Sequence, residues 1–434
     1  MGKRSRRDQR LEEYLGQITA VSGHADRARP MQQYCRGLML DLPRKSVEPM
    51  AAELAESAAQ VQRLHQSLHH VVSMAEWSDR EVLCQVREYA LGRMQKQSKV
   101  TAWIVDDTGT PKKGKHSVGV ARQYCGQTGK QDNCQVAVSL SVATLYASLP
   151  VAWELYLPEE WAKDAERRKK AGVPEGVRFQ TKLEMALGQI RAAVAEKISQ
   201  GVVLADPAYG NSAEFRRELE TLHLSYVVGI QSNASVWAPG TDIGVALKAG
   251  KRGPRKKGQP SDPKPKPLSV KALAQTLPDS CWRTIRWREG TRKTGLSSRF
   301  AAVLVSLAQH GKTASDLRWL LIQWPAPEAE PTKYWLSNLP EDTRLETLVS
   351  TAKQRWIIER DYLELKQELG LGHFEGRSWR GFHHHATLCI AAYGFLVAER
   401  SLFPPSGPFL HARLSQTQRR PNFPPRGAPP LATP

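Results

Sequence analysis

Apolar residues recur every three to four positions through the first 98 residues of the chain. Such spacing places them on one face of a helix and predicts amphipathic helices. The segments with this spacing are residues 11–21, 31–40, 47–72 and 79–94. We therefore expect an N-terminal helical domain over residues 1–98. Its many basic side chains suit a DNA-binding domain, although a purely structural bundle explains these residues nearly as well.

The pattern changes after residue 98 to short apolar runs that end in turn residues, which is typical of strands. The expected strands are residues 100–105, 134–144, 149–158, 201–205 and 224–230. Amphipathic helices are expected at residues 179–198 and 211–222. Three strands followed by alternating helices and strands predict a mixed α/β layer over residues 99–230.

The rest of the chain, nearly half of its length, divides into three further regions. Residues 231–340 contain strand-like, Trp-rich segments and a loop rich in Lys, Pro and Gly at residues 248–267. Residues 341–400 hold two expected helices, about 345–369 and 382–400. Residues 401–434 are rich in Pro and Arg and contain no acid, and we expect them to be disordered.

Charge and cysteine usage narrow the range of partners and compartments. The chain has 62 Lys and Arg against 43 Asp and Glu, a net charge of +19, which favours a polyanionic partner. Its six cysteines form no CxxC pair, as expected for reduced thiols in a cytoplasmic protein. The longest apolar run, residues 386–398, is shorter than the ~20 residues of a membrane span, so we expect a buried helix and no membrane association.

Three acids stand where carboxylates could converge. Asp106 and Asp206 each end an expected strand, and Glu359 lies on an expected helix. Taken singly, such aspartates are often turn residues and such a glutamate is often part of a surface ion pair. Taken together, acids from two strand ends and a helix can hold two Mg²⁺ ions, which activate water and stabilise the leaving oxygen in a displacement at phosphorus.

Arg355, Glu359 and Lys366 are spaced to share one face of that helix with apolar side chains. An Arg one turn from a metal-binding Glu can orient it and also contact phosphate, and the Lys can contact a backbone phosphate. An ordinary helix with salt bridges would show the same spacing.

Three blocks of the chain resemble the DDE transposases of bacterial insertion sequences. They begin with "IVDDTGTPKKGKHSVGV", "VVLADPAYGNSAEFRREL" and "QRWIIERDYLELKQELG", at Ile104, Val202 and Gln354 respectively. The family's signature around its glutamate has Tyr, Arg, Glu and Lys at fixed spacing. Arg355, Glu359 and Lys366 fit it, whereas Ala352 stands at the Tyr position.

The resemblance implies an RNase H-like catalytic core, made here of residues 99–230 and 341–400. It also implies a β-rich insertion between the second Asp and the Glu, for which residues 231–340 leave room. Asp106, Asp206 and Glu359 would be the catalytic and metal-binding acids, and Mn²⁺ would be able to substitute for Mg²⁺. Where "DDT" offers two aspartates, the family pattern selects Asp106 over Asp107, and strand alternation lets only one of them face the metals.

Other residues are candidates for contacts with DNA. They are Lys112, Lys113, Lys115 and Arg377, in addition to Arg355 and Lys366. The three lysines could equally form a solvated basic turn. The tryptophans of the insertion include candidates for stacking on an unpaired base, but core packing is the commoner role. For His383–His385 we expect supporting or DNA-backbone contacts rather than zinc binding.

These observations together predict a transposase that binds the terminal inverted repeats of its element and a target DNA. It would act as a homodimer or larger synaptic complex, in the cytoplasm and associated with the nucleoid. A metal-dependent nuclease without strand transfer is the alternative enzyme. A domesticated DNA-binding protein is the alternative without catalysis.

Overall fold

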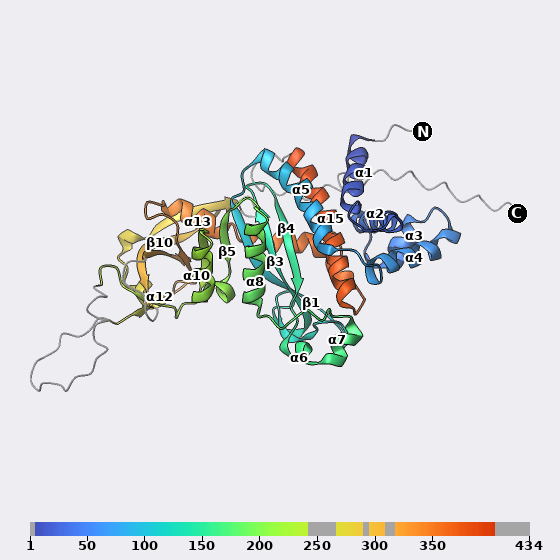
Figure 1. Cartoon of the computed structure of the whole chain (residues 1–434). Coiled ribbons are helices and arrows are strands. Elements are labelled where there is room, and N and C mark those ends of the chain that lie inside the picture. Colours follow the sequence, from blue (N-terminus) through green and yellow to red (C-terminus); the bar gives the residue numbers. More distant parts are fainter. Residues whose placement is uncertain (1–4, 242–265, 290–294, 309–316, 404–434) are drawn as a thin grey trace, which may run out of the picture.

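The computed structural model describes residues 5–241, 266–289, 295–308 and 317–403. Most of the basic loop expected at residues 248–267, and the tail from residue 404, lie outside the described residues. Helices cover both faces of one large mixed sheet (Figure 1). The α/β class expected from the sequence is confirmed.

Five strands form the centre of the sheet, in the order β4-β3-β1-β5-β6. They are β1 (Ala102–Pro111), β3 (Lys130–Ala143), β4 (Ser148–Leu155), β5 (Val202–Ala205) and β6 (Tyr226–Ile230). Strand β3 is antiparallel to β1 and β4, whereas β5 runs parallel to both β1 and β6. This is the RNase H-like arrangement that the family resemblance implies. A short strand that was not expected, β2 (Ala121–Cys125), pairs with β3 at the edge.

The sheet continues beyond β6 without a break. Strand β12 (Lys333–Ser337) pairs antiparallel with β6 and leads through further strands to the far edge. Those strands are β11 (Leu317–Trp324), β10 (Gly295–Leu307), β9 (Arg283–Glu289), β7 (Ser235–Trp237) and β8 (Leu268–Ser269). The β-rich segment therefore extends the central sheet, because backbone hydrogen bonds join β12 to β6.

Helices from distant parts of the sequence cover the sheet. Helix α8 (Lys182–Ala195) packs on one face, and α5 (Asp79–Gln97), α14 (Trp356–Gln367) and α15 (Trp379–Leu402) pack on the other (Figure 1). The N-terminal helices before α5 are α1 (Arg6–Thr19), α2 (Ala25–Met39), α3 (Val47–Leu54) and α4 (Ala58–Ser73). The remaining helices are α6 (Glu159–Lys163), α7 (Ala165–Ala171), α9 (Pro207–Gly210), α10 (Ala213–Thr221), α12 (Val270–Thr276) and α13 (Leu345–Lys353), with 3₁₀ turns at Asp279–Cys281 and Leu371–His373.

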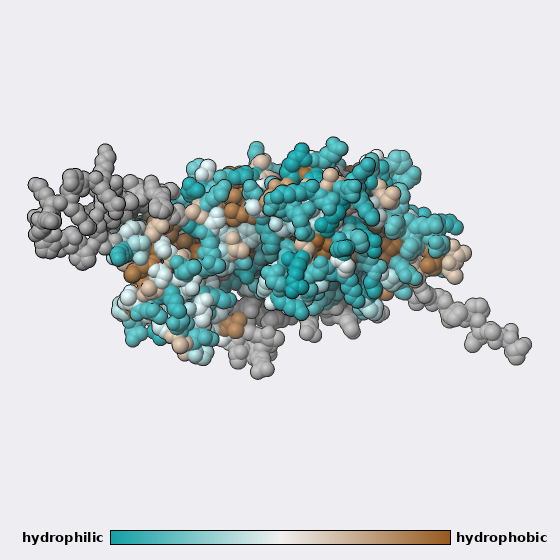
Figure 2. Space-filling view, turned by 90° about the horizontal axis from the view of Figure 1, so that it is seen from below, coloured by the Kyte–Doolittle hydropathy of each residue, from teal (hydrophilic) through white to brown (hydrophobic). Residues whose placement is uncertain are grey.

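One hydrophobic core connects the N-terminal helices with the sheet. Tyr14 of α1 is fully buried, and its hydroxyl donates to the Ala391 carbonyl of α15 at 2.6 Å. None of the helices in the described ranges has the length and apolar character that a membrane span requires. The face in Figure 2 is mostly hydrophilic, with hydrophobic residues in small separate patches.

The three consecutive histidines of α15 belong to this core. The indole of Trp77 stacks on His384, with ring centroids 3.6 Å apart, and His384 Nε2 donates to the Trp77 carbonyl at 3.0 Å. His385 donates from Nε2 to the Gly370 carbonyl at 3.0 Å and accepts from the Tyr34 hydroxyl at 2.9 Å. His383 is buried as well. The DNA-backbone contacts expected for these histidines are therefore wrong, because no ring faces solvent.

Burial makes these histidines sensitive to acid. It lowers the pKa of His384 to about 4 and that of His385 to about 4, from an ordinary value of 6.5. Between these values the unfolded chain binds more protons than the folded chain, so stability is lost as the pH falls from 6.5 towards 4. Each unit of difference between the folded-state and unfolded-state pKa corresponds to about 1.4 kcal/mol of unfolding free energy.

We predict that His384→Phe, which retains a ring against Trp77, reduces the loss of unfolding free energy between pH 6.5 and pH 4.5. Urea titrations at several pH values measure this loss. Exposed His116→Phe is the matched control and should leave the pH dependence unchanged. An unchanged pH dependence in His384→Phe would contradict the assignment of His384 as a buried neutral group.

Candidate active site

Strand β1 carries two adjacent aspartates to opposite faces of the sheet. Asp106 faces α14, where its Oδ2 accepts a hydrogen bond from Arg355 Nη1 at 2.6 Å. Asp107 faces α8, where its Oδ2 accepts from Lys182 Nζ at 2.6 Å. Successive strand residues point to opposite faces, so the two carboxylates have different partners. Of the two, Asp106 faces the helix that carries Glu359.

Asp206 lies beside Asp106 because β1 and β5 are parallel neighbours. Ile104 pairs with Leu204, and each aspartate lies two residues beyond this pair. The expectation that Asp106 ends its strand is wrong, because β1 continues to Pro111 through its pairing with β3, whereas Asp206 directly follows β5. Asp206 is also the N-cap of α9, where its Oδ1 accepts from the Ala208 amide at 2.8 Å. Helix α9 in turn lies close against β6, where a side chain at Gly210 would collide with the backbone of Gly229.

Glu359 comes from α14, and its setting differs from the expected one. The helix expected over residues 345–369 is broken at Gln354 and Arg355 into α13 and α14. Glu359 also does not lie on a buried stripe, since its side chain is 62% exposed. It reaches the other acids through Arg355, whose Nη2 donates to Glu359 Oε1 at 2.9 Å.

The Arg355 guanidinium is thus held among three carboxylates. Burial opposes its charge, but the charges of Asp106, Glu359 and Asp206 outweigh that effect and raise its pKa. Within the described residues, no group of three or more His, Cys, Asp or Glu side chains converges closely enough to hold a metal ion. In this structure the positive charge beside the acids is that of Arg355.

The two partly buried aspartates resist ionisation. Burial raises the pKa of Asp106 to about 7, and the neighbouring charges of Asp206 and Asp107 add to the rise while Arg355 opposes it. Burial likewise raises the pKa of Asp206, again opposed by Arg355. Crowded carboxylates of this kind ionise fully only when positive charge lies beside them. Hard divalent cations prefer such oxygen ligands, so the chemistry of these side chains fits a metal ion.

Comparison with known proteins identifies the family. The model of the DDE superfamily endonucleases matches residues 13–294, which include both aspartates but not Glu359. The chain belongs to the DDE superfamily endonucleases. It is also similar to a probable transposase for insertion sequence element IS701 from Microchaete diplosiphon, with 33% identity over 198 residues. That similarity covers 45% of this chain and 47% of the relative, so the chain spans about half the length of that relative.

A solved structure resembles the chain more distantly. It is the cryo-EM structure of a piggyBac transposase synaptic complex with hairpin DNA. The similarity covers 97% of this chain and 84% of that chain, at 10% identity and a TM-score of 0.38.

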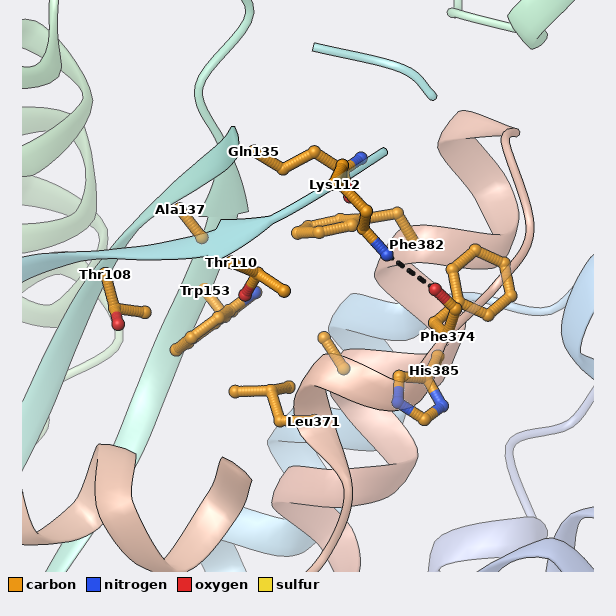
Figure 3. A pocket seen from close by; sticks show the side chains of 11 residues that line it. Thr108, Thr110, Lys112, Gln135, Ala137, Trp153, Leu371, Phe374, Phe382 and His385 are labelled. Carbon is orange, nitrogen blue, oxygen red and sulfur yellow. Dashed lines mark hydrogen bonds between the residues drawn. The ribbon is translucent and has the colours of Figure 1, made fainter. Parts of the chain in front are cut away.

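In this family member, two of the expected DNA-contacting lysines bond to the protein's own backbone. Lys366 Nζ donates to the Gly109 carbonyl of β1 at 2.7 Å, and burial lowers its pKa. Lys112 Nζ donates to the Phe374 carbonyl at 2.6 Å, and burial lowers its pKa to about 8 (Figure 3). Lys366 thus joins α14 to the last residues of β1, and Lys112 joins the residue after β1 to the segment that follows α14.

The other expected basic residues remain at the surface. Lys113, Lys115 and Arg377 are exposed. The Arg377 carbonyl accepts from the Val118 amide at 3.0 Å, which joins the segment after the Lys-rich turn to the start of α15. These three side chains are the ones still available for a partner.

A small pocket continues from Asp106 along the same face of β1. Thr108 and Thr110 follow Asp106 at intervals of two, and both line it with Lys112 (Figure 3). Figure 3 also shows the rings of Phe374 and His385 side by side at its far end.

Two residues at this site were not predicted from the sequence. Lys182 pairs with Asp107 although 74 residues separate them, and no sequence pattern signals that pairing. Tyr209 is buried beside Asp107, Asp106 and Asp206; burial and these charges raise its pKa, and its hydroxyl has no hydrogen-bond partner among the described residues. Its place three residues after Asp206, in the tight turn of α9, was the available signal.

We predict that Arg355→Met destabilises the protein by roughly 1–3 kcal/mol at pH 8, because it leaves the Asp106 carboxylate buried without its cation. The folded-state pKa of Asp106 exceeds its unfolded value, so this carboxyl stabilises the fold below pH 4 and loses that effect as the pH rises through 7. The destabilisation by Arg355→Met should therefore be smaller at pH 5 than at pH 8. Urea unfolding at both pH values measures it.

The double variant Asp106→Asn, Arg355→Met is the control. Removing the charge of Asp106 should restore part of the stability lost at pH 8. A loss in Arg355→Met that is equal at both pH values and unaffected by Asp106→Asn would contradict this electrostatic account.

Proposed function

We propose that this protein is the DNA transposase of a bacterial insertion sequence, with Asp106, Asp206 and Glu359 as its catalytic acids. The observation that carries the proposal is that one guanidinium bonds to both Asp106 of β1 and Glu359 of α14, beside Asp206, which follows the neighbouring strand β5. Membership of an endonuclease family and the similarity to a probable insertion-sequence transposase support it.

The reaction is phosphodiester hydrolysis at the ends of the element, followed by attack of the freed 3′-OH on target DNA in the same site. Asp106, Asp206 and Glu359 would hold two Mg²⁺ ions, or Mn²⁺ in their place. Such ions supply an activated water and stabilise charge on the attacking and leaving oxygens. No side chain acts as a covalent nucleophile.

Arg355 has two roles in this proposal. Without metal it neutralises Asp106 and orients Glu359, as its two hydrogen bonds indicate. With its charge no longer needed to neutralise Asp106, the guanidinium would be available to bind a DNA phosphate through two parallel hydrogen bonds. Lys366 and Lys112 then act mainly by fixing the end of β1, since both donate to backbone carbonyls.

The substrates are the terminal inverted repeats of the element and a target duplex, bound by a homodimer or a larger synaptic complex. Lys113, Lys115 and Arg377 are exposed near the site and would contact the DNA backbone. The protein would act in the cytoplasm on nucleoid DNA.

The first test is cleavage of a labelled duplex that carries the DNA bordering the gene. We predict that Asp106→Asn lowers Mg²⁺-dependent cleavage at least about 100-fold, because transition-state stabilisation by ions in such a site is worth several kcal/mol. Asp107→Asn, its matched neighbour on the opposite face, should retain much more activity. A reversed result for these two variants would show that Asp107 is the first ligand.

Glu359→Gln tests the third acid in the same assay. Cleavage by Glu359→Gln at the wild-type rate would refute the proposed site. The readout that is independent of activity is thermal stability: Mg²⁺ or Mn²⁺ should raise the Tm of the wild type and raise that of Asp106→Asn much less.

Strand transfer separates a transposase from a simple nuclease. We predict that the wild-type protein joins a pre-cleaved 3′ end to a supercoiled plasmid in the presence of Mg²⁺. Cleavage without joining would identify a metal-dependent nuclease, and specific DNA binding with neither activity would identify a domesticated binding protein. Gel analysis of labelled ends distinguishes the three outcomes.

A further inference from the structure

Helix α4 presents an unusual outward face. It lies at the periphery of the N-terminal helices, far from the β-rich end of the molecule (Figure 1). Its inner face is apolar, with Leu64, Leu68, Val71 and Val72 buried. At about 100° per residue, its outward arc spans about 120°. The exposed long side chains of that arc are Gln62, Arg63, Gln66, His69 and His70.

This outward face has no acidic residue. The whole of α4 lacks Asp and Glu, whereas α1 contains Asp8 and α5 contains Asp79 and Glu81. Among the described residues, none forms a hydrogen bond or ion pair with the side chain of Gln62, Arg63 or Gln66. The donors on this arc are therefore available to a partner, and the absence of negative charge favours a polyanion.

The helix rests on a rigid support. Helix α3 packs against α4 through a connection of only three residues, Ala55–Ser57. Helix α2 packs closely on α3, because Gly37 leaves room for Met50 where a larger side chain would collide with it. A short, supported pair of helices can present its second helix to a partner without bending.

The side chains of this arc match the edges of base pairs. The major groove of B-DNA admits one α-helix, Gln forms paired hydrogen bonds with adenine, and Arg forms them with guanine. Gln62 and Gln66 are one turn apart and Arg63 lies beside them, so all three can reach neighbouring base pairs from one helix. His69 and His70 continue the arc by one turn and are placed to contact the sugar–phosphate backbone.

We propose that α4 enters the major groove of duplex DNA and reads its sequence through Gln62, Arg63 and Gln66. This inference rests on the proposed function, since the duplex read would be the terminal repeat of the element. The inference names the helix and the residues that would read the DNA sequence. This surface is separate from the site that contains Asp106, Asp206 and Glu359.

The experiment is a selection of duplexes from a random-sequence pool with the full-length protein, followed by affinity measurements on the selected duplex and on a scrambled one. Gln62→Ala, Arg63→Ala and Gln66→Ala should each weaken binding to the selected duplex by roughly tenfold to a hundredfold. Each should also relax the base preference at one or two positions. Binding to the scrambled duplex should change much less.

Matched controls lie on other exposed helix surfaces. Gln9→Ala on α1 and Arg217→Ala on α10 remove the same side-chain types and should leave the selected sequence and its affinity unchanged. All these variants are at exposed positions, so thermal unfolding should match the wild type and excludes misfolding as the cause of weaker binding.

Three outcomes would overturn the inference. They are selection of no sequence by the wild type, selection of an unchanged sequence with unchanged affinity by the α4 variants, and an equal loss on selected and scrambled duplexes. An equal loss on both duplexes would show that α4 binds phosphates without reading the base sequence. Selection of no sequence by the wild type would also count against binding of terminal repeats in the proposed function. The other two results concern α4 alone, because cleavage that depends on Asp106 and Glu359 is measured separately.

Discussion

The contact between Asp106 and Arg355 is the interaction on which the arrangement of this molecule depends. A carboxylate within a central strand, beside a second aspartate, is costly to ionise in a partly buried position. The guanidinium that offsets this cost comes from the residue just before α14, 249 residues further along the chain. The position of α14 is therefore set by charge as well as by packing, and Glu359 is positioned with it.

Several contacts hold the two helices around Arg355 in place. On one side, Lys366 near the end of α14 donates to Gly109 of β1. On the other, Lys353 at the end of α13 donates to Gln323 of β11 at 2.5 Å and lies over the rings of Trp287 and Trp335 at 4.7 and 4.9 Å. The break between α13 and α14 thus lies between two lysines that bind different parts of the sheet. Lys366 binds β1 of the RNase H-like strands, and Lys353 binds β11 of the strands added beyond β6 (the added strands, β7 to β12). A shift of the added strands would be transmitted to Arg355 and Glu359.

The sequence predicted the apolar strands and the alternation of elements well, because these depend on local pattern, although β1 continues past the expected end to Pro111. Asp106 and Asp206 follow apolar runs that could only be buried strands, and their meeting follows from parallel neighbours. The break at Gln354 and the exposure of Glu359 depend instead on tertiary contacts, since the local residues all favour helix. Pairings such as Lys182 with Asp107 join segments far apart in sequence and leave no periodic signal. For the histidines of α15, supporting or DNA-backbone contacts were expected, and the DNA contacts fail because each ring has a hydrogen-bond partner in the core, which no local pattern indicates.

The tryptophans of strands β9, β11 and β12, and Trp282 just before β9, pack within the protein and do not present free faces to a ligand. Trp282 and Trp335 are only 9% and 8% exposed, and a buried ring cannot stack on a base without moving. Trp282 and Trp324 meet edge to face with Arg299 near both rings, just as Trp287 and Trp335 accompany Lys353. Cations from the chain itself therefore already occupy the faces that an incoming base would need. In this arrangement, strands β7 to β12 contribute to the site by fixing α13 through Lys353.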